Sequence, residues 1–501
     1  KDGARAVALF RRSCDGNDAA ACDEVSTMLL GGTLVAADSA LGFSYNARAC
    51  ELGGTEQSRL RCADAGAAYA SGRKVTADAA RAVALYQRGC DANDARACGE
   101  LARLIAEGKA GTANAAQAVA LYEKGCSGGR PQDCVSLAAL LEQGRGVAAD
   151  PARAATFNEQ GCNAGVGAGC LAAGSALAAG RGVPKDAQRA VSVYRKGCEL
   201  QNADACHALG QMTLRGEGIS TPLPREAATL FAKGCEGGSM SACGELGVLT
   251  AAGNGVDRDA DRARDLFVKA CNGGSFAWCV NVGDGIVEAS PSDSAALTRG
   301  AEFYAAACDG KVAAGCGRLG RAHMTGAGVA RDPNRAVQLF STACEGSDAL
   351  GCAELAHALM RGVGSAADPV KAVPLYEKGC TLGSGDACTT LADLLWGGSK
   401  TTPRNRGNAV ALYEQGCDNG SALGCFNLGR LLMRGDNVKK DEAAGAQRLT
   451  RSCDGGNGRG CAELAEAFDK GRGVAKDVAK SAALYARACE LGWDDKRCGK
   501  R

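Results

Sequence analysis

Apolar and polar positions along this chain follow one pattern that repeats from end to end. A typical unit runs from Ala118 to Asp150 and reads AVALYEKGCSGGRPQDCVSLAALLEQGRGVAAD. Within it, Tyr122 and Cys126 lie four residues apart, which places both on one face of a helix. Gly and polar residues interrupt the apolar pattern twice, after Cys126 and in the GRGV segment. The pattern predicts a helix, a tight turn, a second helix and a Gly loop in every unit.

Paired cysteines mark how often the unit recurs. The 28 cysteines form fourteen pairs, and twelve of these pairs have the spacing C-x7-C. The first cysteines of successive pairs lie 36 or 37 residues apart along most of the chain. A fixed period of this length is typical of solenoids, so we expect an all-α, α/α solenoid in which residues 1–501 form one continuous body. The pairs are Cys14 and Cys22, Cys50 and Cys62, Cys90 and Cys98, Cys126 and Cys134, Cys162 and Cys170, Cys198 and Cys206, Cys235 and Cys243, Cys271 and Cys279, Cys308 and Cys316, Cys344 and Cys352, Cys380 and Cys388, Cys417 and Cys425, Cys453 and Cys461, and Cys489 and Cys498.

The spacing within a pair bears on its chemistry. Eight residues of continuous helix would rise about 12 Å, whereas the Cα atoms of a disulfide lie about 5.5 Å apart. The chain must therefore turn between the two cysteines, and each pair can join the end of one helix to the start of the next. Metal ligation and free thiols are the alternatives, but CxxC pairs are absent and the only histidines are His207, His323 and His357. We predict local disulfides and an extracytoplasmic location (periplasm, cell surface or secreted), because regularly paired cysteines are typical of oxidising compartments.

Gly and Asp mark the helix boundaries. Asp150, Asp332 and Asp368 each precede a Pro, as expected of an N-cap followed by the first helical position. The preceding loop reads G-x-G-V in several units, and its first Gly can end a helix in the left-handed conformation. We expect the Val to pack into the base of the helix pair. These loops begin at Gly144, Gly180, Gly253, Gly326 and Gly471.

An aromatic residue lies four positions before the first Cys in eleven units. Core packing between successive helix pairs is the favoured interpretation, and a ladder that stacks on a ligand is the alternative. Tyr45 and Phe157 are displaced by one position, and Leu449 replaces the aromatic once. The eleven residues are Phe10, Tyr86, Tyr122, Tyr194, Phe231, Phe267, Tyr304, Phe340, Tyr376, Tyr413 and Tyr485.

A basic residue lies two positions before the first Cys in ten units, which would align these residues into a stripe. Complementarity to the dipole at a helix C-terminus is the favoured interpretation, at a few tenths of a kcal/mol each. Binding of an anionic partner, such as a polysaccharide, is the alternative. The ten residues are Arg12, Arg48, Arg88, Lys124, Lys196, Lys233, Lys269, Lys378, Arg451 and Arg487.

Some units depart from the pattern. Eleven residues separate Cys50 from Cys62, and the last pair is one residue wider than the common spacing. The segments 288–294 and 397–407 lack the G-x-G-V loop. Neutral drift is the favoured interpretation of these irregular units, and partner contact is the alternative.

Charge and composition exclude several classes of protein. The net charge is +2, with 58 basic and 56 acidic residues interspersed, unlike the basic excess of a nucleic-acid-binding protein. No run approaches 18 consecutive apolar residues, so we expect no membrane span. The chain begins at Lys1 without Met or a signal peptide, which suggests processing or trimming.

The strings A-x-x-L-Y-x-K-G-C and G-x-G-V-x-x-D, with two cysteines per unit of about 36 residues, resemble the Sel1-like repeat family. The resemblance covers essentially the whole chain and is closest to a disulfide-linked branch typified by the Helicobacter cysteine-rich proteins. It implies a right-handed α/α superhelix related to tetratricopeptide repeats, and a scaffold that binds proteins. Some cysteine-rich members are labelled penicillin-binding or β-lactamase-like, which raises an enzymatic alternative.

Motifs for that alternative are incomplete. A serine β-lactamase needs a nucleophile with Lys one helical turn on, together with S-D-N and K-T-G strings. The segment Ser71-Gly-Arg-Lys74 has the first spacing but lies in a Gly loop, and the other two strings are absent. The string Gly125-Cys-Ser-Gly-Gly129 follows a helix and not a strand, unlike a nucleophile elbow. We therefore predict no catalytic, cofactor-binding or metal-binding residues and no cofactor.

Three functions remain open at this stage. The first is a non-catalytic scaffold whose superhelical groove binds a protein or peptide. The second is a rod or filament subunit that self-associates end to end, suggested by the apparent lack of polar capping repeats at Lys1 and Arg501. The third is a β-lactam-active enzyme. No nucleic-acid partner is expected.

Overall fold

The structure is a computed structural model that describes residues 2–32, 34–53, 55–111, 114–145, 147–399 and 402–498. These residues form α-helices, turns and loops, with one short 3₁₀ helix and no strand. None of the described helices is both long enough and apolar enough to cross a bilayer. The chain divides into two compact units, residues 1–263 and residues 264–501, which we call the N-terminal unit and the C-terminal unit.

The N-terminal unit contains fourteen complete helices among its described residues, and α15 (Ala260–Asn272) contains the boundary between the units. Its helices are α1 (Asp2–Asp15), α2 (Ala19–Gly31), α3 (Ser39–Leu52), α4 (Glu56–Ser71), α5 (Ala79–Asp91), α6 (Ala95–Ala106), α7 (Ala115–Ser127), α8 (Pro131–Gln143), α9 (Pro151–Asn163), α10 (Gly167–Ala179), α11 (Ala187–Glu199), α12 (Ala203–Arg215), α13 (Pro224–Glu236) and α14 (Met240–Ala252).

The C-terminal unit continues the same alternation of helices. Its helices are α16 (Ala277–Ala289), α17 (Ser294–Asp309), α18 (Ala313–Thr325), α19 (Pro333–Glu345), α20 (Ala349–Arg361), α21 (Pro369–Thr381), α22 (Gly385–Gly397), α23 (Arg406–Asp418), α24 (Ala422–Arg434), α25 (Glu442–Asp454), α26 (Gly458–Lys470), α27 (Val478–Glu490) and η1 (Lys496–Cys498). The predicted class, an all-α solenoid of helix pairs, is confirmed. A single continuous body over residues 1–501 stays a prediction.

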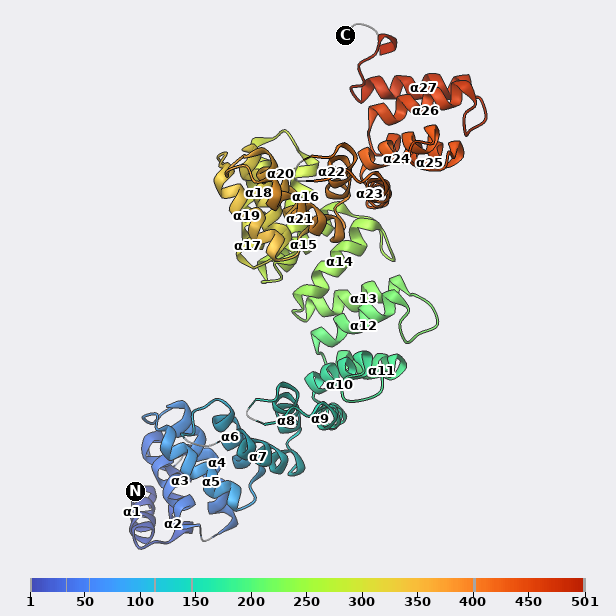
Figure 1. Ribbon diagram of the computed structural model, residues 1–501. Coiled ribbons are helices and arrows are strands. Elements are labelled where there is room, and N and C mark those ends of the chain that lie inside the picture. Colours follow the sequence, from blue (N-terminus) through green and yellow to red (C-terminus); the bar gives the residue numbers. More distant parts are fainter. Residues whose placement is uncertain are drawn as a thin grey trace. The chain divides into compact units, whose positions relative to one another are not determined.

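Odd-numbered and even-numbered helices have different roles. Each odd helix carries the first Cys of a pair, and the next even helix carries the second, except that Cys498 lies in η1. An even helix packs most closely against the odd helix after it, and in many units a Gly loop joins the two. The neighbouring pairs α12 with α13 and α24 with α25 illustrate this packing (Figure 1). The two sides of an odd helix are therefore held differently, by apolar packing on one side and by a disulfide on the other.

Disulfides join the helices at every tight turn. All 28 cysteines are paired with their sequence neighbours, with Cα–Cα distances between 4.4 and 5.3 Å. The third residue after the first Cys adopts a positive φ, as at Asn17 (69°) and Asn93 (64°). Asp94 then caps the next helix, since its Oδ1 accepts a hydrogen bond from the Arg96 amide at 2.9 Å. The local disulfide in each repeat, which was part of the predicted fold, is confirmed.

The Gly loops use both glycines. The first ends the even helix in the left-handed region, with φ of 72° at Gly180 and 81° at Gly326. The second also has a positive φ and lies against the backbone at the start of the preceding odd helix. An added Cβ at Gly182 would collide with Pro151, and one at Gly328 would collide with Leu297. The loop sequence therefore sets the distance between neighbouring repeats as well as the end of a helix.

The predicted N-cap residues and the Val residues of the Gly loops lie as expected from the sequence. Asp150, Asp332 and Asp368 each accept a hydrogen bond at 3.0 Å from the amide three residues on. Val183 and Val329 of the Gly loops are partly buried against the apolar core, as expected.

Small residues on the even helices make room for the aromatic residues on the odd helices. An added Cβ at Gly210 would lie 2.6 Å from the Phe231 ring, and one at Gly320 would lie 2.7 Å from Phe340. Both glycines are the fourth residue after the second Cys. The fully buried Phe231 and Phe340 rings therefore pack directly against helix backbone.

Candidate functional site: the even-helix face

Hollows recur on the surface formed by consecutive even helices, which we call the even-helix face. Three of them in the C-terminal unit have the aromatic residue of the intervening odd helix at their floor. We name them the Tyr304, Tyr376 and Tyr413 hollows. Their volumes are about 420, 380 and 270 Å³, respectively.

The Tyr304 hollow contains a hydrogen-bonded triad. The Tyr304 hydroxyl donates to Asp284 Oδ1 at 2.8 Å, and Arg318 Nε lies 2.7 and 2.9 Å from the two oxygens of the same carboxylate. Burial, together with the Asp284 carboxylate, raises the pKa of Tyr304. Burial acts to lower the pKa of Arg318, but the hydrogen bonds and charge of Asp284 hold it above its ordinary value. Tyr304 therefore stays a neutral donor and Arg318 a cation.

The Tyr376 hollow has a histidine beside its floor hydroxyl. The Tyr376 hydroxyl lies 3.2 Å from His357 Nδ1, and burial raises the pKa of Tyr376 to about 12. Leu350 and Leu423 line the hollow, and the Leu423 residue is 45% exposed. An exposed leucine beside a concave surface can bury its side chain against a ligand.

The Tyr413 hollow again contains a carboxylate. The Tyr413 hydroxyl donates to Asp393 Oδ1 at 2.5 Å, and Asn427 Nδ2 donates to the same oxygen at 3.2 Å. Burial raises the pKa of Asp393, and the hydrogen bond from Tyr413 opposes this shift. Burial and Asp393 together raise the pKa of Tyr413. The guanidinium groups of Arg430 and Arg434 line the same hollow and supply cations.

These polar floor groups were not predicted from the sequence. Asp284, His357 and Asp393 are each the fifth residue after the second Cys of their pair. Each bonds to the Tyr hydroxyl 19 or 20 residues further along the chain. The register of the repeat is the signal that could have found them.

A fourth hollow, of about 420 Å³, lies on the even-helix face of the N-terminal unit. Asn46 lies in its lining where the other three hollows have Tyr, so we call it the Asn46 hollow. Ser71 and Lys74, the candidate nucleophile and its Lys, line this hollow as well. The Ser71 hydroxyl donates to the Ala67 carbonyl of its own helix at 2.8 Å. Its hydrogen bond is therefore that of a serine at a helix end.

The described residues include no group of three or more His, Cys, Asp and Glu side chains placed to hold a metal ion.

Thirteen segments of the chain match the Sel1 repeat, and together they span far more than half of it. They are residues 1–18, 19–54, 62–94, 95–129, 132–166, 168–202, 203–239, 241–275, 313–348, 349–384, 385–421, 422–457 and 458–493. The chain belongs to the Sel1 repeat family. The predicted family is thus confirmed.

Solved structures with Sel1 repeats resemble the chain. The c5321 protein of uropathogenic Escherichia coli, described as a protective antigen, is 22% identical, covers 97% of this chain and 88% of its own, and gives a TM-score of 0.46. Cysteine-rich protein B of Helicobacter pylori is 31% identical over 27% of this chain and 96% of its own, with a TM-score of 0.23. A Sel1 repeat protein of Oxalobacter formigenes is 19% identical over 77% of this chain and 89% of its own, with a TM-score of 0.35. No curated protein matches the chain.

The matched segments place eleven of the fourteen disulfides between neighbouring Sel1 repeats. A matched segment such as residues 95–129 contains an even helix and the odd helix after it. Cys90 lies in the preceding segment and Cys98 in this one, so their bond joins the two repeats covalently. The interface that a solenoid otherwise holds by packing alone is therefore crosslinked.

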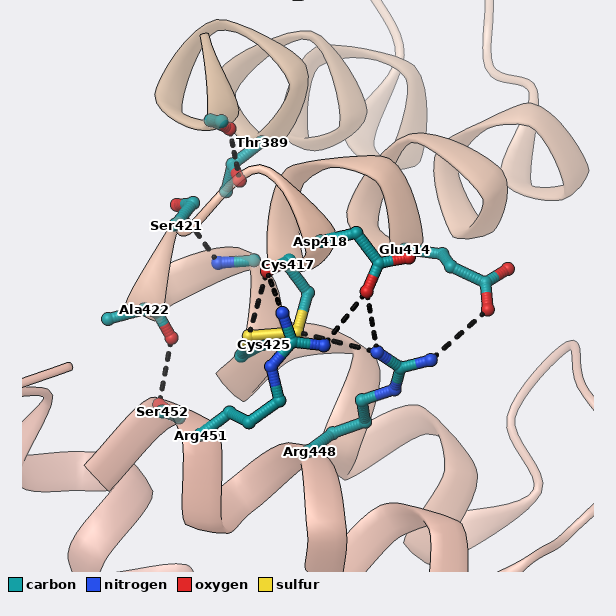
Figure 2. The surroundings of a disulfide bond; sticks show 12 residues. Thr389, Glu414, Cys417, Asp418, Ser421, Ala422, Cys425, Arg448, Arg451 and Ser452 are labelled. Carbon is teal, nitrogen blue, oxygen red and sulfur yellow. Dashed lines mark hydrogen bonds and ion pairs between the residues drawn. A yellow bond between two sulfur atoms is a disulfide. The ribbon is translucent and has the colours of Figure 1, made fainter. Parts of the chain in front are cut away.

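Several residues of the predicted basic stripe form a second link between Sel1 repeats. Arg88 donates to the Glu51 carbonyl at 2.7 Å, and Lys378 donates to the Cys344 carbonyl at 2.7 Å. In Figure 2, Arg451 donates to the Cys417 carbonyl at 2.9 Å and to Asp418 at 2.8 Å. These three residues therefore complement a helix C-terminus, but that helix belongs to the preceding repeat. These cations are engaged within the protein.

Eight of the eleven aromatic residues of the predicted ladder are buried, and the other three are partly buried. Tyr86 is 1% exposed and Tyr376 is 2% exposed, so their ring faces are covered by protein. Core packing accounts for these rings, and stacking of a ligand on them does not. Only polar edges, such as the Tyr304 and Tyr413 hydroxyls, reach groups that line the hollows.

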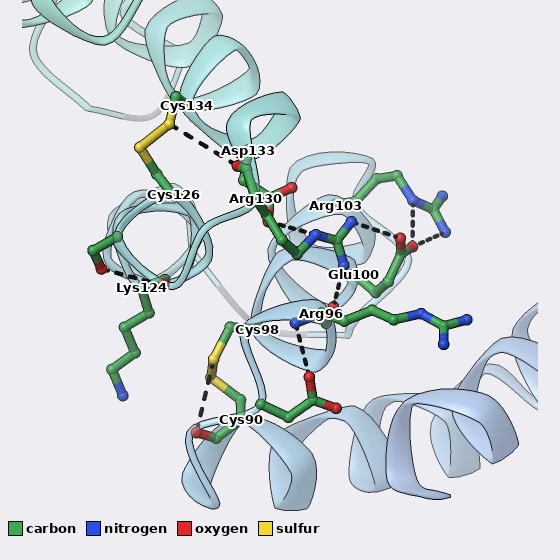
Figure 3. Close-up of polar contacts among 12 residues, drawn as sticks. Cys90, Arg96, Cys98, Glu100, Arg103, Lys124, Cys126, Arg130, Asp133 and Cys134 are labelled. Atoms are coloured by element: carbon green, nitrogen blue, oxygen red, sulfur yellow. Dashed lines mark hydrogen bonds and ion pairs between the residues drawn. A yellow bond between two sulfur atoms is a disulfide. The ribbon is translucent and has the colours of Figure 1, made fainter. Parts of the chain in front are cut away.

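A buried carboxylate distinguishes one repeat junction of the N-terminal unit. Asp133 is 4% exposed and occupies the position before the second Cys, where most repeats have Ala or Gly. Gly99 and Gly125 make room for it, since an added Cβ at either would collide with Asp133 Oδ2. Arg130 Nε lies 3.2 Å from this oxygen, beside the Cys126–Cys134 disulfide (Figure 3), yet Oδ2 has no aligned hydrogen-bond donor among the described residues. Burial raises the pKa of Asp133 to about 6, although the charge of Arg130 opposes the shift.

Both irregular loops adjoin hollows. Glu288, at the start of the segment 288–294, lines the Tyr304 hollow. This segment falls between two matched Sel1 segments, 241–275 and 313–348. The segment 397–407 follows Trp396 of the Tyr413 hollow, and the Arg406 guanidinium lies 4.9 Å from the Trp396 ring centroid. Residues 400 and 401 of this segment lie outside the described residues. Partner contact by these loops stays an alternative.

Proposed function

We propose that the chain is an extracytoplasmic scaffold that binds extended peptide segments along its even-helix faces. The observation that carries this proposal is the recurrence of one kind of hollow, at three repeats of the C-terminal unit and one of the N-terminal unit. A Sel1-repeat fold is compatible with protein–protein interaction. The peptide and the surface on the chain are parts of the proposal.

The hollows have the size and chemistry that side chains of a peptide need. A cavity of about 150 Å³ accommodates benzene, so hollows of 270 to 420 Å³ can admit a side chain. Each combines apolar walls with a few oriented polar groups, which is the usual composition of a binding pocket. Asp284 and Asp393 can accept hydrogen bonds from a peptide, and Arg430 and Arg434 can donate them.

Disulfides support the extracytoplasmic part of the proposal. Many disulfides indicate an oxidising environment, and none of the 28 cysteines is free. Each bridge closes a short loop, and such a crosslink stabilises a fold by roughly 2.5 kcal/mol in the chain-entropy model. Crosslinks at successive repeats oppose the local fraying to which solenoids are prone. The binding face would therefore be rigid before the peptide arrives.

A peptide selection tests the proposal. The oxidised full chain is used to select binders from a phage-displayed library of random dodecapeptides, and affinities are measured by fluorescence anisotropy. Leu423→Lys should weaken binding about tenfold or more for peptides that occupy the Tyr376 hollow, because burying a leucine contributes about 1.5–3 kcal/mol. Val370→Lys is the matched control, since Val370 is 66% exposed at the start of the odd helix α21. Equal effects of both changes, or no selected peptide, would contradict the proposal.

The filament hypothesis stays an alternative. Sedimentation velocity over a wide concentration range tests it, since a filament subunit would form larger species as its concentration rises.

A further inference from the structure

The floor of the Asn46 hollow differs from that of the Tyr hollows. Asn46 lies four residues before Cys50, where most repeats have an aromatic residue. Ser26 lies four residues after Cys22, where many repeats have Gly or Ala, and its hydroxyl donates to Asn46 Oδ1 at 2.5 Å. Asn46 is only 1% exposed. A hydrogen-bonded serine hydroxyl and asparagine amide therefore replace the glycine and the ring.

One donor of this pair has no acceptor. Asn46 Nδ2 makes no hydrogen bond among the described residues, although it is buried and its residue lines the hollow. A buried donor without a partner costs about 1–3 kcal/mol. A ligand atom that accepts from Nδ2 would remove that cost.

Cations surround the same hollow. Arg61 and Arg96 line it and form ion pairs with Asp23 and Asp64, respectively. Arg73 and Lys74 line it from the Gly loop after α4. Both are exposed, and neither makes an ion pair with a described residue. The charge that remains unbalanced at this hollow is therefore positive.

We infer that the Asn46 hollow binds a carboxylate, supplied by a Glu or Asp side chain of the extended peptide. That the ligand is a peptide rests on the proposed function. That it presents a carboxylate rests on Asn46, Arg73 and Lys74. Asn46 Nδ2 donates to one carboxylate oxygen, while the two cations of the loop approach the group from the open side. Hydrogen bonds in which one partner is charged are shorter and stronger than neutral ones.

Peptide mixtures of defined charge test this inference on the oxidised full chain. Dodecapeptide mixtures, acetylated and amidated at their ends, carry Glu or Gln at one fixed position, and anisotropy measures their affinities. We expect the Glu mixture to bind about tenfold more tightly than the Gln mixture. A Gln mixture with a free C-terminus shows whether a chain end can supply the carboxylate. Dextran sulfate is a further probe, and its binding without a preference for Glu peptides would overturn the inference.

Two variants and a control assign the preference to this hollow. Arg73→Glu with Lys74→Glu changes only exposed side chains, and Asn46→Asp keeps the shape of the buried amide. Each should bring the Glu and Gln mixtures to within about twofold of one another. Arg145→Glu with Lys185→Glu changes exposed residues of other Gly loops and should leave the tenfold preference intact. A preference retained in both variants would overturn the inference.

A small-molecule arm separates this inference from the proposed function. Glutarate is titrated into the full chain labelled with ¹⁵N-asparagine, and the Asn46 side-chain resonances are followed, with the Arg73→Glu and Lys74→Glu variant as reference. Saturable shifts in the wild type alone, without any peptide binding, would uphold the carboxylate site and contradict the peptide scaffold. Absence of both peptide binding and glutarate shifts would overturn the inference.

Discussion

The Asn46 hollow and the Tyr304 hollow occupy equivalent places in two repeats but solve the same packing problem differently. At Tyr304 a ring fills the core beside Gly283, and its hydroxyl, Asp284 and Arg318 satisfy one another. At Asn46 the smaller amide bonds to Ser26, and its Nδ2 is left without a partner. The repeat therefore fixes where the floor residue lies. The identity of that residue decides whether the polar groups at the floor bond to one another or leave a donor that needs an acceptor from a ligand.

Replacing each floor residue with Ala should show the largest difference between the two hollows. Tyr304→Ala leaves a cavity in the core and should lower the local free energy of unfolding by about 3–5 kcal/mol. Asn46→Ala should cost less, about 1–3 kcal/mol, because it removes one hydrogen bond and a donor that was already unpaired. Hydrogen exchange of the flanking helices, measured by mass spectrometry, reports both values. An equal cost for the two changes would show that the ring is not the main support of its repeat.

Asp133 can be compared with Asn46, because it is another buried polar residue of the N-terminal unit with an atom that has no hydrogen-bond partner among the described residues. Its pKa is raised to about 6 in the folded chain. The folded state therefore holds the proton more tightly than the unfolded state, so stability is lost as pH rises from about 4 to about 6 and then stays lower. The loss is about 3 kcal/mol.

The Asp133→Asn variant tests that cost. It keeps the shape of the side chain but removes the charge, so stability at pH 7 should rise by up to about 3 kcal/mol. The dependence of stability on pH between 4 and 6 should flatten accordingly. Urea unfolding at several pH values, followed by hydrogen exchange of α6 to α8, measures both effects. An unchanged pH dependence would show that Asp133 is not the group that titrates.

A single disulfide has an intermediate effect. Replacing Cys417 and Cys425 with Ser together should lower the stability of that repeat junction by roughly 2.5 kcal/mol. The loss should be confined to the adjoining helices, because contacts in a solenoid are mainly with neighbours. Limited proteolysis compares α23 to α25 with the unchanged α18 to α20. Loss of protection throughout the C-terminal unit would contradict this local effect.

The smallest change tests the polar network of the Tyr304 hollow. Tyr304→Phe keeps the ring but removes the hydroxyl that donates to Asp284, while Arg318 still pairs with that carboxylate. The expected cost is about 1 kcal/mol. Denaturant unfolding measures it, with Phe340→Tyr as a comparison in a repeat whose aromatic has no hydroxyl. A cost above 3 kcal/mol would show that the ion pair with Arg318 is not sufficient to keep Asp284 in place without the Tyr304 hydroxyl.

Much of the fold was predictable because its signals are local. The Asp-Pro caps, the Gly loops and the paired cysteines each act within a few residues, and the structure has them as predicted. The hollows were not predictable, because the bond between Asp393 and Tyr413 depends on how two helices align. The burial of Asp133 was missed for a similar reason, since the room for it comes from Gly99 and Gly125 on two other helices.

The central claim is that ligands bind on the even-helix face. Hydrogen exchange of the full chain, with and without a selected dodecapeptide, tests it most directly. We predict that added protection concentrates on consecutive even helices and their Gly loops, and that it disappears for the Leu423→Lys variant when the peptide lies over the Tyr376 hollow. Protection concentrated on the odd helices would contradict the account.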